Sequence, residues 1–262
     1  MLLTIWLWIL CYAVSAQVRI VSLSPMDSKA LILLDAADDV VACTKWCPFA
    51  EEKTVVANAI DVNVEQVLRT KPDVVFASTL TNSESINTMQ QLGLNVVILP
   101  RINSFEQLCA NFVLIGKLIG KEALAQAEVA KAKQRLDSLK QRIPANEKPP
   151  KVMFQVGTKP VFVAIKNTFI HDYIVQAGGQ NIYDDLAHGT VTRESVITRN
   201  PDAIFISTMP ASAENAQAVW LSYNELSATQ HNEVVLIDQE KASSPTVHTF
   251  VDVVEQMIKT LY

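Results

Sequence analysis

Serines, histidines and carboxylates in this sequence could support hydrolysis, but their arrangement does not favour a catalytic site. Ser243 and Ser244 lie near His248 in the chain, where a serine nucleophile and a histidine base would suit a hydrolase. No third group that would orient the histidine is identifiable. Adjacent carboxylates point apart and are more often solvated turn charges than an acid and base pair. Such pairs occur at Asp38–Asp39, Glu51–Glu52 and Asp184–Asp185. We therefore expect a protein without catalytic residues.

The cysteines allow three different roles. Cys43, Cys47 and Cys109 follow the apolar N-terminal segment, and an odd number permits at most one disulfide within the chain. Cys43 and Cys47 lie on either side of Trp46 and could form a disulfide, bind a metal as a pair, or be two small buried hydrophobic side chains. Zinc would need two further ligands at short spacing, and none follow in the sequence. These roles stay open, with metal binding the least favoured.

All histidines lie in the second half of the chain, namely His171, His188, His231 and His248. A metal ion held between the two halves would also need ligands from the first half, where Asp27, Cys43 and Cys47 are the only obvious candidates. Free zinc or manganese is usually bound by several histidines together with carboxylates. The ligand count therefore disfavours a free-metal site, and we expect no resident metal or other cofactor.

The composition is globular and mildly acidic. The chain has 262 residues, of which 49% are hydrophobic and 19% charged, and its formal net charge is −5. An acidic chain without a basic stripe cannot neutralise many phosphates, which argues against nucleic-acid binding by the usual electrostatic route. The seven glycines form no dinucleotide fingerprint, phosphate-binding loop or nucleophile elbow. The commonest glycine-dependent enzyme sites are therefore absent as motifs.

The N-terminus has the pattern of a secretory signal peptide. Residues 2–14 are apolar apart from Thr4 and are too few to span a bilayer of about 30 Å as a helix. The segment ends in Val14-Ser15-Ala16, a small-residue cleavage pattern. We predict a signal peptide over residues 1–16, cleaved before Gln17, and an exported mature protein.

Beyond the signal, short apolar runs alternate with segments of helical pattern. Such runs suit strands buried on both faces, and the alternation is typical of parallel βαβ units. The runs are residues 19–23, 40–43, 74–77, 95–99, 151–156, 202–206 and 234–238. Strong helix formers continue from 121 to 143 and stop at Pro144. We predict an N-terminal α/β lobe at 17–120, a connecting helix at 121–143 and a C-terminal α/β lobe at 150–262.

An internal repeat supports two similar lobes. Residues 61–79 and 190–208 align at a constant offset of 129, and eight of the nineteen positions are identical. The identities include Glu65 with Glu194 and Pro72-Asp73 with Pro201-Asp202. Both segments end in Ser-Thr, at Ser78-Thr79 and Ser207-Thr208. Because ligands of open α/β sheets bind beyond the carboxyl ends of strands, we expect these two dipeptides to face each other across a cleft.

Several segments, in this order, resemble the periplasmic substrate-binding proteins of metal-chelate ABC importers. They are Arg19-Ile20-Val21-Ser22-Leu23-Ser24-Pro25, residues 40–48 with Trp46, Val64-Glu65 through Pro72-Asp73, residues 92–97, Asn167-Thr168-Phe169-Ile170, residues 177–182 and Asn200-Pro201-Asp202. The resemblance covers almost the whole mature chain. It implies two Rossmann-like lobes with central parallel sheets, joined by one long backbone helix, in a protein that moves little on binding.

The resemblance also implies functional residues. Each lobe of such a protein presents a glutamate to arginines of the membrane permease, and Glu65 and Glu194 occupy those positions. Ordinary first-turn glutamates favoured by the helix dipole are the alternative. Ligand contacts are implied at Met26, Trp46, Phe49, Ser78, Thr79, Lys159, Phe162, His188, Met209 and Gln239. His188 could be an axial ligand to haem iron or corrinoid cobalt, although a polar residue at the cleft rim is favoured.

The expected function is capture of a metal chelate, either cobalamin or another corrinoid, or a ferric siderophore, and its delivery to an ABC permease with its ATPase. The expected protein is a monomer that binds no nucleic acid. Binding of haem or of a free metal ion is the alternative, and an exported hydrolase is the alternative from a different class.

Overall fold

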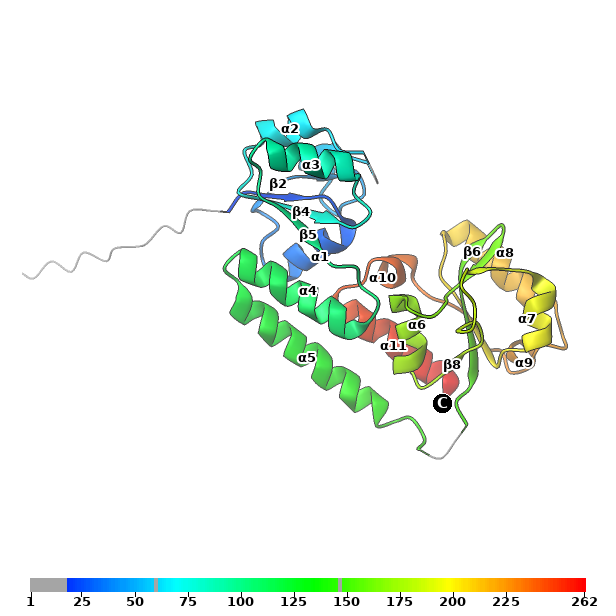
Figure 1. The fold of residues 1–262 in the computed structure, drawn as a ribbon. Coiled ribbons are helices and arrows are strands. Elements are labelled where there is room, and N and C mark those ends of the chain that lie inside the picture. The colour runs from blue at the N-terminus through cyan, green and yellow to red at the C-terminus, as the bar shows by residue number, and fades with distance from the viewer. Residues whose placement is uncertain (1–17, 59–60, 146–147) are drawn as a thin grey trace, which may run out of the picture.

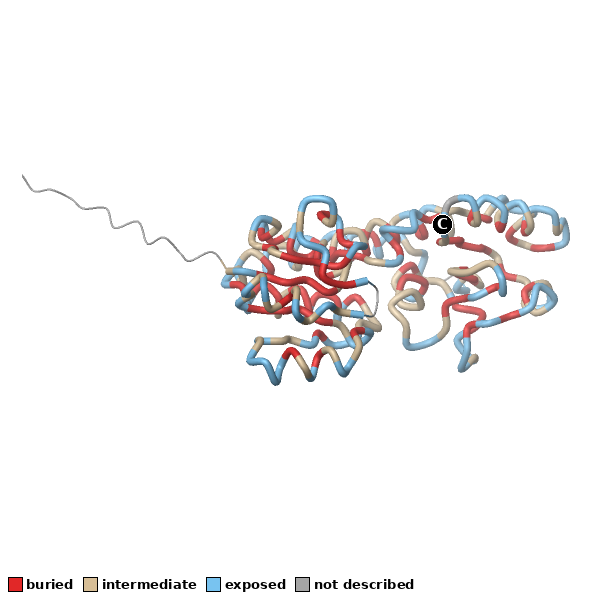
Figure 2. The backbone as a smooth tube through the Cα atoms, turned by 90° about the horizontal axis from the view of Figure 1, so that it is seen from above, coloured by how far each residue is buried: buried red, intermediate tan, exposed pale blue. Residues whose placement is uncertain are grey.

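The computed structural model describes residues 18–58, 61–145 and 148–262, so the signal peptide predicted at 1–16 lies outside the described residues. Two α/β lobes lie side by side, with helices packed beneath and between them (Figure 1). Buried backbone is concentrated in the strands of both lobes, while the outer helices carry the exposed residues (Figure 2). Within the described residues, no helix is long and apolar enough to cross a membrane.

The N-terminal lobe is built on a five-stranded parallel sheet in the order β3-β2-β1-β4-β5. Its strands are β1 (Ile20–Ser22), β2 (Val40–Thr44), β3 (Thr54–Ala57), β4 (Val74–Ser78) and β5 (Val96–Leu99). Successive side chains of a strand point to opposite faces of the sheet. Val75 and Ala77 therefore pack under α2 (Val64–Arg69) and α3 (Ser83–Gln91), while Val74 and Phe76 pack toward α1 (Pro25–Leu33).

The C-terminal lobe has a mixed sheet in the order β11-β10-β6-β7-β9, with the short β8 pairing with β6. Its strands are β6 (Lys151–Thr158), β7 (Val161–Val163), β8 (Gln180–Asn181), β9 (Thr190–Val191), β10 (Ala203–Ile206) and β11 (Val234–Leu236). β10 runs parallel to β6 and β11, but β7 is antiparallel to both β6 and β9. Only Lys159 and Pro160 separate β6 from β7, and so short a connection permits only a hairpin. The two-lobed α/β fold is confirmed, with this local departure from an all-parallel second sheet.

The helices of the second lobe surround this sheet. They are α6 (Phe169–Gln176), α7 (Arg193–Arg199), α8 (Pro210–Leu221), α9 (Ser227–Gln230), α10 (Gln239–Ser243) and α11 (Val247–Leu261). The buried face of α11 includes Phe250, Val254 and Met257, at the spacing of one helix face.

Two antiparallel helices, α4 (Phe105–Leu118) and α5 (Glu122–Lys140), connect the lobes. The 19 residues of α5 extend about 28 Å, within the segment predicted as a connecting helix. The helices lie side by side beneath the first lobe, and both also pack on α11 (Figure 1). A Cβ at Gly116 would lie 2.6 Å from the Cβ of Ala125, so glycine permits the close approach of α4 and α5. The long helix is therefore half of a helical hairpin rather than an isolated rod.

One hydrophobic core continues from lobe to lobe through these helices. It joins Phe76 of the first sheet and Phe154 of the second with residues of α1, α4, α5 and α11. Phe250 contacts both Phe105, at 4.9 Å between ring centroids, and Tyr173, at 4.4 Å. Because the lobes share packed side chains, their relative position is set by close packing.

Candidate functional site

A cleft of about 450 Å³ lies between the lobes, a volume within the usual range of small-molecule sites. The carboxyl ends of β1, β4 and β5 form one wall, and the start of α6 and the end of α10 form the other. The lining residues are Ser24–Asp27, Ser78–Leu80, Leu99–Ile102, Asn111, Thr168–Ile170, Ser243 and Ser244. This is the strand edge at which open α/β sheets bind ligands.

Capping residues shape both walls. Ser24 caps α1, and its Oγ accepts from the backbone N–H of Asp27 at 3.4 Å. Thr168 caps α6 in the same way, with its Oγ1 3.1 Å from the backbone N of His171. Serine and threonine satisfy the free N–H groups of a helix start, so the sequence places hydroxyl-bearing residues at this edge.

Apolar side chains complete the cleft surface. Met26, Leu80 and Ile102 come from the first lobe, and Phe169 and Ile170 from the second. Leu80 is 78% exposed, on a turn in which the Ser78 backbone N–H donates to Thr81 Oγ1 at 3.2 Å. An apolar surface with a few hydroxyl groups around it suits a mostly apolar ligand with polar edges.

The structure brings together only part of the predicted ligand set. Met26, Ser78 and Thr79 line the cleft. The side chains of Trp46, Phe162 and Met209 are 61%, 45% and 67% exposed near strand ends of the two lobes, but they are not among the lining residues. Lys159, His188 and Gln239 are likewise exposed and outside the lining.

Two sequence predictions about the cleft need correction. Phe49 is only 7% exposed and packs in the shared core, because the turn that follows β2 folds it inward. Ser207 is buried at the end of β10, so Ser207-Thr208 does not face Ser78-Thr79 in the cleft lining. The start of α6 occupies that wall instead.

Arg101 and Asn111 line the cleft but were not predicted from the sequence, which suggested Asp27 only as a ligand for a metal ion between the two halves. Arg101 could have been found, because it follows the apolar run that became β5 and therefore lies at the same strand edge. Asn111 lies mid-helix on α4 and is held by its own bond, from Nδ2 to the Pro100 carbonyl at 2.8 Å. Nothing in the local pattern around Asn111 distinguishes it from a surface residue.

Asp27 is the buried charged group of this site. It is 7% exposed, and its Oδ2 has no hydrogen-bond partner among the described residues. Burial raises the pKa of this carboxyl to about 7, since the charged form is poorly solvated, although a hydrogen bond with Ser24 opposes the shift. Asp27 also lines a small side cavity of about 10 Å³ between α1 and α4.

The cysteines are free thiols in this structure, and Cys43, Cys47 and Cys109 are all buried. Cys47 Sγ accepts from Ser28 Oγ at 2.9 Å, and hydrogen bonding from Cys43 lowers its pKa to about 6. Among the described residues no three His, Cys, Asp or Glu side chains are grouped to hold a metal ion. The arrangement corresponds to buried thiols, the third of the roles left open by the sequence.

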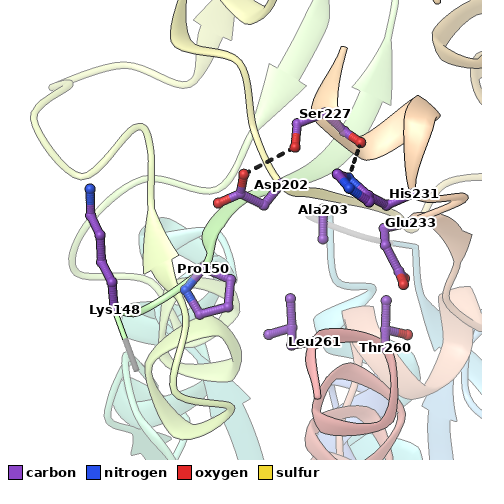
Figure 3. Close-up of a pocket in the computed structure, with 9 residues that line it drawn as sticks. All are labelled: Lys148, Pro150, Asp202, Ala203, Ser227, His231, Glu233, Thr260 and Leu261. Carbon is purple, nitrogen blue, oxygen red and sulfur yellow. Dashed lines mark hydrogen bonds between the residues drawn. The ribbon is translucent and has the colours of Figure 1, made fainter. Parts of the chain in front are cut away.

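A second cavity of about 380 Å³ lies at the opposite end of the C-terminal sheet (Figure 3). Asp202 Oδ1 accepts from Ser227 Oγ at 3.2 Å, and His231 Nδ1 donates to the Ser227 carbonyl at 2.9 Å (Figure 3). The first bond ties α9 to the start of β10, and the second lies within α9 and its C-cap. The cavity lies at the amino ends of the strands, away from the edge where such sheets bind ligands.

Glu65 and Glu194 are exposed in the first turns of α2 and α7, the equivalent helices of the two lobes. Glu65 pairs with Arg69 of its own helix at 2.6 Å. Hydrogen bonds from its own backbone and from Thr192 lower the pKa of Glu194. Both carboxyl groups are accessible at the positive end of a helix dipole, as a contact with arginine would require.

Comparisons with known proteins agree with this architecture. The chain is 25% identical over 245 residues to the vitamin B12-binding protein of Vibrio cholerae, covering 91% of this chain and 87% of that protein. The crystal structure of the periplasmic vitamin B12-binding protein of V. cholerae superposes with a TM-score of 0.79 at 25% identity, covering 93% of this chain and 96% of that one. The periplasmic haem-binding protein of the same organism gives 0.82 at 19% identity, covering 94% and 100%, which is a likeness of fold alone.

The profile of the family described as "Periplasmic binding protein" matches residues 20–241, which is most of the chain. Proteins of this family are periplasmic binding proteins for small molecules rather than enzymes. The cleft, the two lobes and the helices that join them therefore have a common explanation: the chain belongs to the periplasmic binding protein family.

Proposed function

We propose that this protein captures a metal chelate, a corrinoid or a ferric siderophore, in the inter-lobe cleft and delivers it to an ABC permease. The observation that carries the proposal is the cleft of about 450 Å³, which is lined from both lobes by apolar side chains and hydroxyl groups. The vitamin B12-binding relatives support the choice of a corrinoid.

Four exposed apolar side chains extend the proposed binding surface to the rim. Trp46 follows β2 and Leu80 follows β4 in the first lobe, while Phe162 and Met209 belong to the second. Large exposed apolar side chains of this kind often contribute to a binding surface. The ammonium of Lys45 lies 4.8 Å from the centre of the Trp46 ring. We assign these side chains to contacts with the outer part of a large chelate.

Delivery would use Glu65 and Glu194 as paired contacts with arginines of the permease. Their equivalent helices place one exposed carboxylate on each lobe, and arginine binds carboxylate in a bidentate way that sets orientation as well as affinity. In this proposal the protein acts as a monomer, exported by a signal peptide cleaved before Gln17.

The test is a titration of the purified mature protein with cyanocobalamin, dicyanocobinamide, haemin and a panel of ferric siderophores. Only two tryptophans follow the signal segment, and Trp46 is 61% exposed while Trp220 is 1% exposed. We therefore expect quenching of Trp46 fluorescence with about 1:1 stoichiometry and sub-micromolar affinity for at least one chelate. Trp46→Phe should lose the quenching while calorimetry still detects binding. If calorimetry and fluorescence detect no chelate, the proposal fails.

A further inference from the structure

The carboxyl group of Asp27 is unusual because it is buried and only partly satisfied. It belongs both to the cleft lining and to the side cavity of about 10 Å³. Its residue is 7% exposed, and Oδ2 has no hydrogen-bond partner among the described groups. A buried acceptor without a donor destabilises the folded state, because it has lost its bonds to water and gained none in return. The fold tolerates this cost at a wall of the binding cleft, where a bound molecule could supply the donor.

Few of the side chains around Asp27 carry a positive charge that could stabilise its ionised carboxyl group. On its own helix, Lys29 is directed toward the second lobe, where its Nζ donates to the Glu240 carbonyl at 3.1 Å. The turn after β2 contributes the Cys47 thiol, whose charge raises the pKa of Asp27 further. The segment after β5 contributes Arg101 to the cleft lining. In both cavities, α4 and the segment from α10 to α11 contribute no ionisable side chain among the described residues.

We propose that Asp27 is a ligand-binding residue whose free Oδ2 accepts a hydrogen bond from an amide N–H at the edge of the chelate. The inference rests on the proposed function and restricts the ligand to chelates that carry amide groups at their edge. A chelate edged with neutral amides satisfies the buried oxygen, whereas a chelate that places a carboxylate there meets a second acceptor. Asp27 therefore selects amide-edged chelates, a class that includes the corrinoids, over carboxylate-edged chelates such as haem.

The proposal predicts opposite pH dependences for the two classes of chelate. An ionised carboxylate accepts stronger hydrogen bonds than a protonated one. As the pH rises through about 7, Asp27 loses its proton, so affinity for an amide-edged chelate rises. Affinity for a carboxylate-edged chelate falls over the same range, because two negative groups are then brought together.

The experiment measures the affinity of dicyanocobinamide and of haemin at about pH 6 and about pH 8 for the wild type and for Asp27→Asn. We expect wild-type affinity for dicyanocobinamide to rise about tenfold across this range and affinity for haemin to fall. Asp27→Asn should show neither slope, because it keeps the shape of the side chain without its titration. Asp38→Asn, on an exposed aspartate outside the cleft, should keep the wild-type slopes.

The outcomes separate this inference from the proposed function. If the wild type binds dicyanocobinamide without a rise in affinity, or if Asp27→Asn keeps the slope, Asp27 is not a ligand-binding residue and the function stands. If the wild type binds no chelate, both fail together. Asp27→Ser serves as a second variant if Asp27→Asn does not fold, and a slope that persists in Asp27→Ser overturns the inference in the same way.

Discussion

In the first lobe, Asp73 Oδ2 accepts from the backbone N–H of Arg19 at 2.8 Å, and in the second lobe Asp202 Oδ2 accepts from that of Lys151, also at 2.8 Å. The side chain of Arg19 or Lys151 then reaches the C-terminal end of the helix that comes just before the aspartate, α2 in the first lobe and α7 in the second. Arg19 Nη2 donates to the Thr70 carbonyl at 2.6 Å, and Lys151 Nζ to the Arg199 carbonyl at 2.7 Å. A positive group near a helix C-terminus is favourable. The aspartate of the repeated Pro-Asp therefore makes the same contacts in both lobes, where it joins the start of a strand to the end of a helix. We call this arrangement the corner of each lobe.

The lobes differ where the cleft is formed. β1 of the first sheet has parallel neighbours on both sides, so the loops after β1, β4 and β5 converge on one edge. In the second sheet the antiparallel β7 lies next to β6. Most of the cleft lining, with both of its charged residues, Asp27 and Arg101, comes from the first lobe. The first lobe therefore supplies most of the polar side chains of the cleft lining, and the second lobe completes the wall with residues of α6 and α10.

The largest expected effect on the free energy of unfolding is at the packing that the lobes share. Phe250→Ala removes a fully buried ring that contacts Phe105 and Tyr173, so a loss of about 3–5 kcal/mol is expected. Urea denaturation should show a single transition for both lobes. Val175→Ala, at a residue that is 50% exposed, should cost below about 1 kcal/mol. Two separate transitions in the wild type would contradict the shared core.

The next effect concerns Asp27 in the absence of any chelate. Its folded pKa of about 7 lies above the ordinary 3.8, so the folded state holds the proton more tightly than the unfolded state. Stability is therefore fully present below about pH 4 and falls as the pH rises toward 7. At about pH 8, Asp27→Asn should be more stable than the wild type, by up to about 4 kcal/mol, and at about pH 4 the gain should vanish. Urea denaturation of both proteins at each pH measures this difference in the free energy of unfolding. A difference that does not change with pH would contradict the raised pKa of the buried Asp27 carboxyl.

The duplicated corner allows a matched pair of variants. Asp73→Ala and Asp202→Ala should each lose about 1–2 kcal/mol, because each removes an acceptor for a backbone N–H. The loss should be larger for Asp202, which also accepts from Ser227 Oγ at 3.2 Å and is less exposed. Thermal unfolding of the two variants measures the difference. If only one variant is destabilised, the corners are not equivalent.

The smallest effect on stability is expected at the two exposed glutamates. Glu65→Ala and Glu194→Ala should leave unfolding and chelate affinity unchanged, because both side chains lie in solvent. Each should reduce association with the permease and uptake in cells, and the double variant should abolish uptake. Reduced chelate affinity together with unchanged permease association would contradict their role in docking. Arg69→Ala, which frees Glu65 from its own helix, is the matched control that keeps the carboxylate.

Strand and helix positions could be predicted from sequence because each depends on a local pattern. The run at 74–77 became β4, and the helix formers within 121–143 became α5. Ser78 and Thr79 were found because a strand end is visible in the chain, and the strand-end rule then places them in the cleft. Phe49 was misplaced because nothing in its own neighbourhood shows which way the turn after β2 folds.

The sequence by itself determined two similar α/β halves with a long helix between them, since hydrophobic periodicity, helix formers and a repeated Pro-Asp act over a few residues. Only the tertiary structure decided that α5 pairs with α4, that β7 is antiparallel to β6, and that a buried oxygen of Asp27 has no hydrogen-bond partner among the described residues. Packing, register and desolvation depend on residues far apart in the chain. A local sequence pattern therefore cannot predict these features.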